Sequence, residues 1–311
     1  MARLLITGAL GFIGSHIAQL ALEAGHEVAA LDNLSTGRRE NVPSAVRIFE
    51  VDLRDADAVN ATFAAFKPEL VSHQAAQASV PGSFKDPLTD AQVNVLGTLN
   101  LLEAARIHRV ERLVMASTGG AIYGEIPGGE LGRVGGPLSP STPYAVSKLA
   151  GEGYLEVYRQ HHGLSTSVLR YSNVYGERQS VHGEAGVVAA FCEALLRGES
   201  LRVNGCLEAG DRGCVRDYVY VGDVARANLL SLAGHAPPLL DVATGIGTDS
   251  RTLAEGLAAA YGQPVSIEGA PPRLGDVRRS VLDAAPLRAA LGELTSLEAG
   301  LARTLAWYRT R

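Results

Sequence analysis

The sequence predicts an α/β protein with a doubly wound parallel sheet and a smaller C-terminal lobe. In the N-terminal half, short apolar runs alternate with helical patterns, as a parallel sheet covered by helices on both faces requires. A glycine-rich turn follows the first apolar run, and the regular alternation weakens after residue 170. At 311 residues and 46% hydrophobic content, the chain is long enough for one large domain that carries a smaller lobe.

Each predicted element follows from the period of its apolar residues. Short apolar runs bounded by turn residues are typical of buried strands, and longer amphipathic runs are typical of helices. The predicted strands are residues 3–7, 27–31, 46–51, 70–73, 112–117 and 166–170. The predicted helices are residues 12–24, 55–66, 87–108, 144–162, 222–233 and 296–308.

Long irregular segments after residue 170 indicate where the second part of the chain begins. Glycine, proline and charged residues interrupt the pattern at 177–186, 205–215 and 269–279, and loops of that length are usually functional. We therefore predict a first domain at 1–172, to which part of 216–234 returns, and a second lobe at 173–311.

Three glycines in residues 8–14 stand between the first strand and the first helix. Glycine permits the tight turn there and lets backbone N–H groups approach a pyrophosphate at the helix N-terminus. Asp32 ends the next strand, 24 residues after Gly8, where a carboxylate binds ribose hydroxyls and repels a 2′-phosphate. Arg38 and Arg39 could accommodate that phosphate, but we expect them on a solvated loop. The pattern predicts a Rossmann-type domain that binds NAD rather than NADP.

Tyr144 and Lys148 lie four residues apart in a predicted helix and therefore share a face. A free tyrosine titrates at about 10, so bringing its pKa to about 7 requires about 4 kcal/mol of differential stabilisation. A cation in a poorly solvated cleft can supply it. Only three lysines, Lys67, Lys85 and Lys148, stand among the 28 basic residues. The pair predicts a tyrosine that acts as an acid and base.

Composition excludes several other classes of function. The net charge of −5 and the lack of a basic stripe argue against a nucleic-acid partner. The eight histidines show no metal-ligand spacing, so we expect no metal. Three cysteines without a CxxC spacing fit a reducing compartment. Met1 leads directly into a strand and no apolar run approaches about 20 residues, so we expect a cytoplasmic protein without a signal peptide or membrane span.

Further motifs resemble the extended short-chain dehydrogenase/reductase superfamily and, within it, the sugar-nucleotide 4-epimerases. Asp-Asn-Leu-Ser-Thr-Gly at 32–37 matches the adenosine-ribose loop, and His-Gln-Ala-Ala at 73–76 matches the fourth strand. Asn94 matches an asparagine on the cofactor side. Leu-Arg-Tyr-Ser-Asn-Val-Tyr-Gly at 169–176 and Val-Arg-Asp-Tyr at 215–218 match nucleotide-sugar motifs. The resemblance covers essentially the whole chain.

The resemblance implies NAD-dependent epimerisation of a UDP-hexose at C4, which interconverts UDP-glucose and UDP-galactose through a 4-keto sugar. It implies that Tyr144 takes the proton of the 4-hydroxyl as hydride passes to the nicotinamide. Thr118 would bridge substrate and tyrosine, and Lys148 would also hold the nicotinamide ribose. A homodimer is a further expectation from the family.

The glycine motif and the resemblance together give the expected binding residues. The cofactor contacts are Gly8, Gly11, Phe12, Ile13, Gly14, Asp32, Asn33, Ser35, Thr36, Gly37, Asp52, Leu53, Gln74, Ala75, Ala76, Gln77, Asn94, Tyr144, Lys148 and Ser172. The UDP-sugar contacts are Thr118, Tyr144, Asn173, Arg216, Arg273 and Ser280. Because Ser280 is small, we also expect room for the N-acetyl group of UDP-N-acetylglucosamine.

The chain departs from the family pattern at two places. Its fifth-strand motif, residues 117–124, is one residue longer than usual, and counting back from Tyr123 places the catalytic hydroxyl at Gly119. We assign the role to Thr118, on the assumption that the extra glycine bulges, and keep Ser117 as the alternative. The insertion at 204–214 is expected to be a solvated surface loop.

Three other functions use the same framework. A 4,6-dehydratase places Asp-Glu after its threonine, whereas this chain has Gly119-Gly120 and so lacks the acid for elimination. Epimerases of UDP-N-acetylglucosamine or of UDP-uronic acids remain alternatives, because one core can serve different sugars. A non-catalytic NAD-binding sensor would be expected to lack Tyr144 or Lys148, and both are present.

Overall fold

Seven strands form one sheet in the order β10-β6-β5-β4-β1-β2-β3, and neighbours from β3 to β5 pair in parallel. This computed structural model describes residues 1–181, 186–205, 210–271 and 277–311. The strands are β1 Arg3–Thr7, β2 Glu27–Asp32, β3 Arg47–Glu50, β4 Leu70–His73, β5 Arg112–Thr118, β6 Ser165–Tyr171 and β10 Leu239–Val242. A doubly wound parallel sheet places the carboxyl ends of its central strands along one ligand-binding edge.

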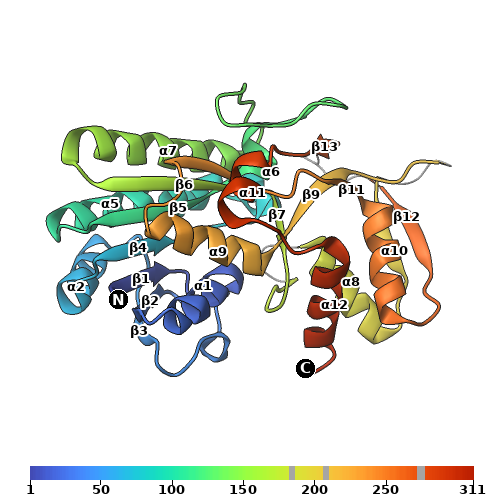
Figure 1. Cartoon of the computed structure of the whole chain (residues 1–311), viewed down its shortest axis with the longest axis horizontal. Coiled ribbons are helices and arrows are strands. Elements are labelled where there is room, and N and C mark those ends of the chain that lie inside the picture. Colours follow the sequence, from blue (N-terminus) through green and yellow to red (C-terminus); the bar gives the residue numbers. More distant parts are fainter. Residues whose placement is uncertain (182–185, 206–209, 272–276) are drawn as a thin grey trace. The chain divides into compact units, whose positions relative to one another are not determined.

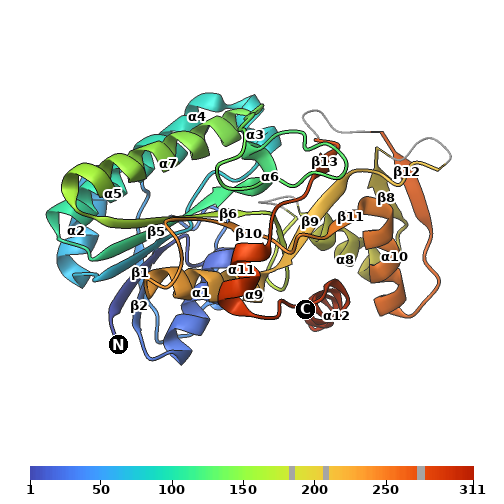
Figure 2. The same cartoon turned by 45° about the horizontal axis from the view of Figure 1, so that its top comes forward.

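Helices cover both faces of this sheet, which confirms the predicted fold class. Figures 1 and 2 show α5 and α7 on one face and α1 and α9 on the other. The helix α2 packs on α5. The bounds are α1 Phe12–Glu23, α2 Ala56–Phe66, α5 Gly97–Ile107, α7 Pro143–His162 and α9 Val221–Leu232.

The predicted helix at 87–108 is confirmed as a continuous helical stretch over residues 87–107, which contains a π turn that was not predicted. It consists of α4 Pro87–Ala91, the π-helical turn Gln92–Leu96 and α5, and the short helix α3 Val80–Lys85 precedes it. A side-chain hydrogen bond lies at the π turn: Thr98 Oγ1 donates to the carbonyl of Asn94 at 2.7 Å. Single π turns inside helices often mark functional positions.

Smaller sheets organise the rest of the chain. One has the order β11-β9-β13, with β7 also paired to β9, and the other joins β8 to β12. These strands are β7 Asn173–Tyr175, β8 Leu201–Asn204, β9 Val215–Tyr220, β11 Gly247–Asp249, β12 Ile267–Ala270 and β13 Arg279–Ser280. The remaining helices are α6 Gly119–Ile122, α8 Val187–Arg197, α10 Ser250–Tyr261, α11 Ala285–Leu291, α12 Leu297–Tyr308 and a 3₁₀ turn Arg39–Asn41.

The chain divides into two compact units, and each is built from separate segments. Unit 1 holds 1–118, 142–170 and 225–240. Unit 2 holds 119–141, 171–224 and 241–311. Residues 119–141 therefore group with unit 2 rather than with the first domain predicted from the sequence, and the returning segment is 225–240.

Ion pairs hold the described part of the 204–214 insertion in place. Arg212 pairs with Asp249 at 3.1 Å and with Glu255 at 2.8 Å, and Asp211 pairs with Arg278. Exposed pairs of this kind contribute at most about 1 kcal/mol each. The solvated loop expected there is therefore also tied to α10, while residues 206–209 lie outside the described part.

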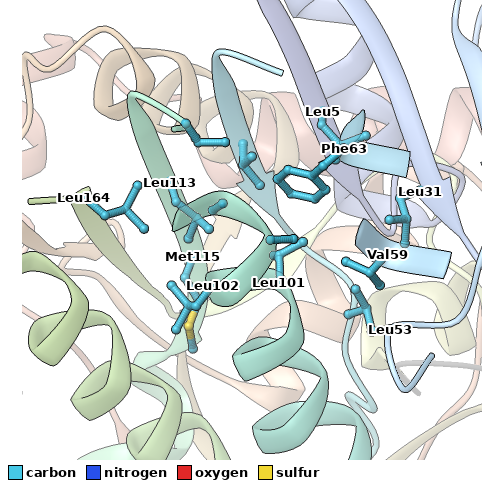
Figure 3. Close-up of a cluster of buried hydrophobic side chains, with 14 of the residues drawn as sticks. Leu5, Leu31, Leu53, Val59, Phe63, Leu101, Leu102, Leu113, Met115 and Leu164 are labelled. Carbon is cyan, nitrogen blue, oxygen red and sulfur yellow. The ribbon is translucent and has the colours of Figure 1, made fainter. Parts of the chain in front are cut away.

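The core of unit 1 lies between the sheet and the helices α2, α5 and α7. Figure 3 shows Phe63 of α2 with Leu5 of β1 and Leu101 of α5, and all three are fully buried. Met115 of β5 belongs to the same cluster. Burial of such side chains supplies most of the stability of the scaffold that positions the site.

We predict that Phe63→Ala lowers the free energy of unfolding by about 3–5 kcal/mol, because it removes a buried ring and leaves a cavity. Ile246→Ala is the matched control, since Ile246 is 59% exposed in the loop before β11. Urea unfolding followed by circular dichroism measures both. Equal effects for the two variants would contradict this description of the core.

Candidate active site

The turn between β1 and α1 leaves no room for side chains. Gly8 has φ +65°, and a Cβ there would lie 2.7 Å from the backbone nitrogen of Ala75. A Cβ on Gly14 would overlap the carbonyl oxygen of Gly8. The turn therefore needs glycine at both positions.

The N-terminus of α1 has no capping side chain, because its N-cap residue is Gly11. By contrast, the helices α2, α7, α10 and α12 begin with the capping side chains of Asp55, Thr142, Asp249 and Ser296. The first N–H groups of α1 are thus left for a ligand, and the helix dipole favours an anion. This end fits the diphosphate of NAD.

Asp32 ties the glycine turn to the end of β2. One of its oxygens accepts the Leu10 N–H at 3.0 Å, and the other accepts the Leu34 N–H at 2.8 Å. Burial raises the pKa of Asp32, and these two bonds oppose the rise. Each oxygen keeps a lone pair that can accept a ribose hydroxyl.

The nearby arginines are engaged with surface carboxylates. Arg39 pairs with Glu50 at 2.7 Å, and Arg38 lies 3.9 Å from Glu40. All four side chains are more than half exposed. This matches the expected solvated loop.

Asp52 follows β3 and is held by Asn33 and Arg54. Asn33 Nδ2 donates to Asp52 at 2.9 Å, and Arg54 pairs with it at 2.8 Å. The hydrogen bonds from Arg54 lower the pKa of Asp52. Two predicted cofactor residues, Asn33 and Asp52, are thereby joined at the ends of β2 and β3.

His73 links the end of β4 to β1 and α5. Thr7 Oγ1 accepts the N–H groups of Gln74 and Ala75, so its own proton goes to His73 Nδ1 at 2.7 Å. The other ring nitrogen then donates to Thr98 Oγ1 at 3.0 Å. Burial lowers the pKa of His73 to about 3, so the ring is neutral and fixed in one tautomer.

Asn94 and Gln77, both predicted cofactor residues, are bonded to each other. The Gln77 N–H donates to Asn94 Oδ1 at 2.9 Å, and Asn94 Nδ2 donates to the Gln77 carbonyl at 3.0 Å. Nδ2 also donates to Asp90 at 3.1 Å, so both N–H groups of the Asn94 amide have hydrogen-bond partners. In this structure Asn94 therefore shapes the loop after β4.

Tyr144 and Lys148 lie on the first turns of α7, as predicted. Lys148 is only 3% exposed, whereas Tyr144 is partly exposed. Burial lowers the pKa of Lys148 to about 8, and the carboxylates of Asp90 and Glu152 oppose that effect. A buried cation thus lies one helical turn from a phenol that a ligand can reach.

The two candidate hydroxyls at the end of β5 have different surroundings. Ser117 Oγ donates to Glu152 at 2.6 Å, and Glu152 also pairs with Arg170 at 2.6 Å. Thr118 is buried, and its hydroxyl makes no hydrogen bond within the described part of the chain. The hydroxyl of Ser117 therefore already donates its hydrogen bond to Glu152, while the hydroxyl of Thr118 can donate one to a ligand.

Three predicted substrate residues lie on the small sheet of unit 2. Asn173 of β7 is in register with Tyr218, and Ser280 of β13 is in register with Arg216. Ser280 is 2% exposed. Arg216 donates to the Val215 carbonyl at 3.1 Å and has no carboxylate within ion-pair distance among the described residues. The prediction at Arg273 lies outside the described residues.

Ser172, the remaining predicted cofactor residue, precedes this sheet. Its N–H donates to the Val242 carbonyl at 3.0 Å. Its hydroxyl is buried and has no hydrogen-bond partner among the residues that the structure describes. Such a group is costly unless a ligand pairs with it.

Several polar side chains near Tyr144 and Lys148 were not among the predicted site residues. Asp90, Ser147, Glu152 and Arg170 were not singled out, although Glu152 stands four residues after Lys148. Ser147 directly precedes Lys148 on α7, whereas only the tertiary structure brings Asp90 and Arg170 to this helix. The positions of Ser147 and Glu152 relative to Lys148 are the signals that the sequence offers.

Among the described residues, no His, Cys, Asp and Glu side chains form a group that could hold a metal ion. No helix in the same ranges is both long and apolar enough to span a bilayer.

Comparison with known proteins agrees with the geometry. The model of the NAD dependent epimerase/dehydratase family matches residues 4–238. A UDP-glucose 4-epimerase of Mycolicibacterium smegmatis is 44% identical and covers 99% of both chains. The crystal structure of the Thermus thermophilus UDP-glucose 4-epimerase with NAD has 51% identity and a TM-score of 0.94, over 99% of each chain. The Thermotoga maritima UDP-glucose 4-epimerase with UDP-glucose has 41% identity and a TM-score of 0.92, again over 99% of each.

The range matched by the family model, residues 4–238, contains the glycine turn, Asp32, Tyr144 and Lys148. The chain belongs to the NAD dependent epimerase/dehydratase family.

Proposed function

We propose that this protein interconverts UDP-glucose and UDP-galactose by epimerisation at C4, a step of galactose metabolism, with NAD as its cofactor. The observation that carries the proposal is the buried Lys148 one turn from Tyr144, in a chain similar over its full length to UDP-glucose 4-epimerases. When bound, NAD supplies a reversible hydride acceptor for the C–H bond at C4.

The protein side of the reaction is a proton transfer at the 4-hydroxyl. Tyr144 takes this proton as a phenolate and returns it when the opposite epimer forms. The ammonium of Lys148 stabilises the phenolate and binds the nicotinamide ribose. Thr118 donates its free hydroxyl to the sugar oxygen. The N-terminus of α1 and Asp32 hold the cofactor, through its diphosphate and its adenosine ribose.

We assign binding of the UDP-sugar to unit 2. Arg216 is suited to the diphosphate because a guanidinium matches phosphate oxygens and this one has no ion pair among the described residues. Asn173 contacts the diphosphate or the sugar, and Arg273 is assigned to the diphosphate by its sequence position alone. Ser280 was expected to leave room for an N-acetyl group, and activity on UDP-N-acetylglucosamine stays a prediction.

The alternatives are less well supported. A 4,6-dehydratase needs an acid and a base after its threonine, and Gly119 and Gly120 of α6 offer neither. A non-catalytic sensor does not require a buried lysine beside an accessible tyrosine.

We also propose a cytoplasmic homodimer. Val146, Ala150, Tyr154 and Val157 form one stripe along α7, and Val146 and Val157 are 53% and 47% exposed. Covering such a stripe with a second copy would bury apolar surface. The free thiols of Cys192 and Cys214 fit a reducing compartment.

We predict that the purified protein converts UDP-galactose to UDP-glucose without added NAD, and that Tyr144→Phe lowers kcat by about 10²–10⁴-fold, the contribution of a positioned acid and base. Tyr154→Phe is the matched control on the same helix, because Tyr154 is exposed. Fold and NAD content should not change in either variant. Retention of more than a tenth of the activity by Tyr144→Phe would reject the assignment.

The hydroxyl at the end of β5 can be assigned by two variants. Thr118→Val keeps the shape of the side chain and should lower kcat by about 10²–10³-fold, as loss of one transition-state donor does. Ser117→Ala should have a smaller effect, because this hydroxyl serves Glu152. A larger loss from Ser117→Ala would transfer the catalytic role to Ser117.

Cofactor choice should depend on Asp32. Asp32→Ala removes the acceptor of the ribose hydroxyls, so the affinity for NAD should fall. It also removes the charge that repels a 2′-phosphate, so the ratio of NAD affinity to NADP affinity should decrease. Calorimetric titration of both cofactors gives the ratio. General damage to the turn would weaken the binding of NAD and NADP alike and leave the ratio unaltered, and that result would contradict the assignment of Asp32 to the ribose.

A further inference from the structure

Two carboxylates, Asp90 and Glu152, raise the pKa of the buried Lys148, and they differ in whether another cation already balances their charge. Glu152, one turn later on α7, pairs with Arg170 at 2.6 Å, and both side chains are more than 90% buried. Ser117 donates a further hydrogen bond to it. The charge of Glu152 is therefore already balanced by a guanidinium. Asp90 on α4 is the second carboxylate.

Asp90 is completely buried, and within the described part of the chain its carboxylate receives hydrogen bonds from neutral groups only. Ser147 Oγ donates to Oδ2 at 2.6 Å. Gln77 Nε2 and Asn94 Nδ2 donate to Oδ1 at 2.9 and 3.1 Å. A buried charge is strongly unfavourable unless a charge of opposite sign is near it. Lys148, the neighbour of Ser147 in sequence, is the buried cation that meets this need.

The other groups that face Lys148 cannot replace Asp90. His73 on β4 is neutral and is held in a hydrogen-bond chain. Tyr144 precedes Lys148 on α7 and carries no negative charge until it loses its proton. Glu152 is paired with Arg170 of β6.

We infer that Asp90 is the counter-charge that keeps Lys148 protonated, and that Ser147 holds this carboxylate against α7. Asp90 is a positioning residue, because it acts through Lys148 and not on the sugar. Without its charge, Lys148 would lose its proton at a lower pH. A neutral lysine stabilises the Tyr144 phenolate poorly, so the alkaline limb of the activity profile would move to lower pH. This last step rests on the proposed function, whereas the protonation of Lys148 does not.

The scarcity of lysine makes the ammonium directly observable. With Lys67 and Lys85 replaced by arginine, ¹⁵N-lysine labelling leaves Lys148 as the one labelled side chain. Its ¹⁵Nζ shift is followed against pH by NMR, and kcat is measured over the same range. Neither Lys67 nor Lys85 belongs to the site.

In that background, Asp90→Asn should lower the titration midpoint of Lys148 by about one pH unit or more, the usual effect of a nearby opposite charge. The asparagine keeps the shape, and the Ser147 hydroxyl can turn to accept from its amide. Asp86→Asn is the matched control, because Asp86 is exposed at the N-cap of α4 and asparagine also caps well. It should leave the midpoint in place.

The alkaline limb of kcat should shift with the NMR midpoint. An unchanged Lys148 midpoint in Asp90→Asn overturns the inference. A shifted midpoint in a protein without epimerase activity would uphold the role of Asp90 and reject the proposed function.

A double variant covers the case in which Asp90→Asn does not fold. In a Lys148→Met background the carboxylate has no cation to balance, so Asp90→Asn should be tolerated there and should not lower the free energy of urea unfolding. Equal destabilisation in both backgrounds would show that Asp90 is only structural and would overturn the inference.

Discussion

The site depends on keeping a lysine charged in a place that water hardly reaches. Lys148 is 3% exposed, and burial is the main reason why its pKa is lowered to about 8. The surrounding protein opposes this with carboxylates on α4 and α7. Because the lysine lies one turn from Tyr144, each interaction that holds its charge also affects the acidity of the phenol.

Buried polar side chains also hold the loops at the proposed cofactor site of unit 1. Asp32 accepts hydrogen bonds from the N–H groups of the glycine turn and of its own turn, so the residue proposed to select the cofactor also fixes the loop proposed to bind the diphosphate. His73 acts similarly, because its neutral ring joins the ends of β1 and β4 to α5. Buried polar side chains therefore set the geometry of the loops, while the apolar core sets the positions of the strands.

The fold could be predicted from the sequence, and reactive residues could be proposed from it, because both depend on local sequence patterns. The glycine turn, Asp32 and the Tyr144–Lys148 spacing lie within single elements or at their ends. The π turn at 92–96 could not be predicted, because it accompanies hydrogen bonds that join Asn94 to Gln77 and Thr98 to His73, both distant in sequence. Asp90 was missed for the same reason, since its partners come from the loop after β4 and from α7. The grouping of 119–141 with unit 2 likewise depends on tertiary contacts.

The central claim is that Tyr144 moves only the hydroxyl proton while the hydrogen on C4 leaves and returns as hydride. The direct measurement is the fate of deuterium during turnover of UDP-[4-²H]galactose in ordinary water, read by NMR and mass spectrometry of the UDP-glucose formed. We expect the deuterium to remain at C4 of the product. Its replacement by hydrogen from water would mean that C4 loses a proton rather than a hydride, and would contradict the account.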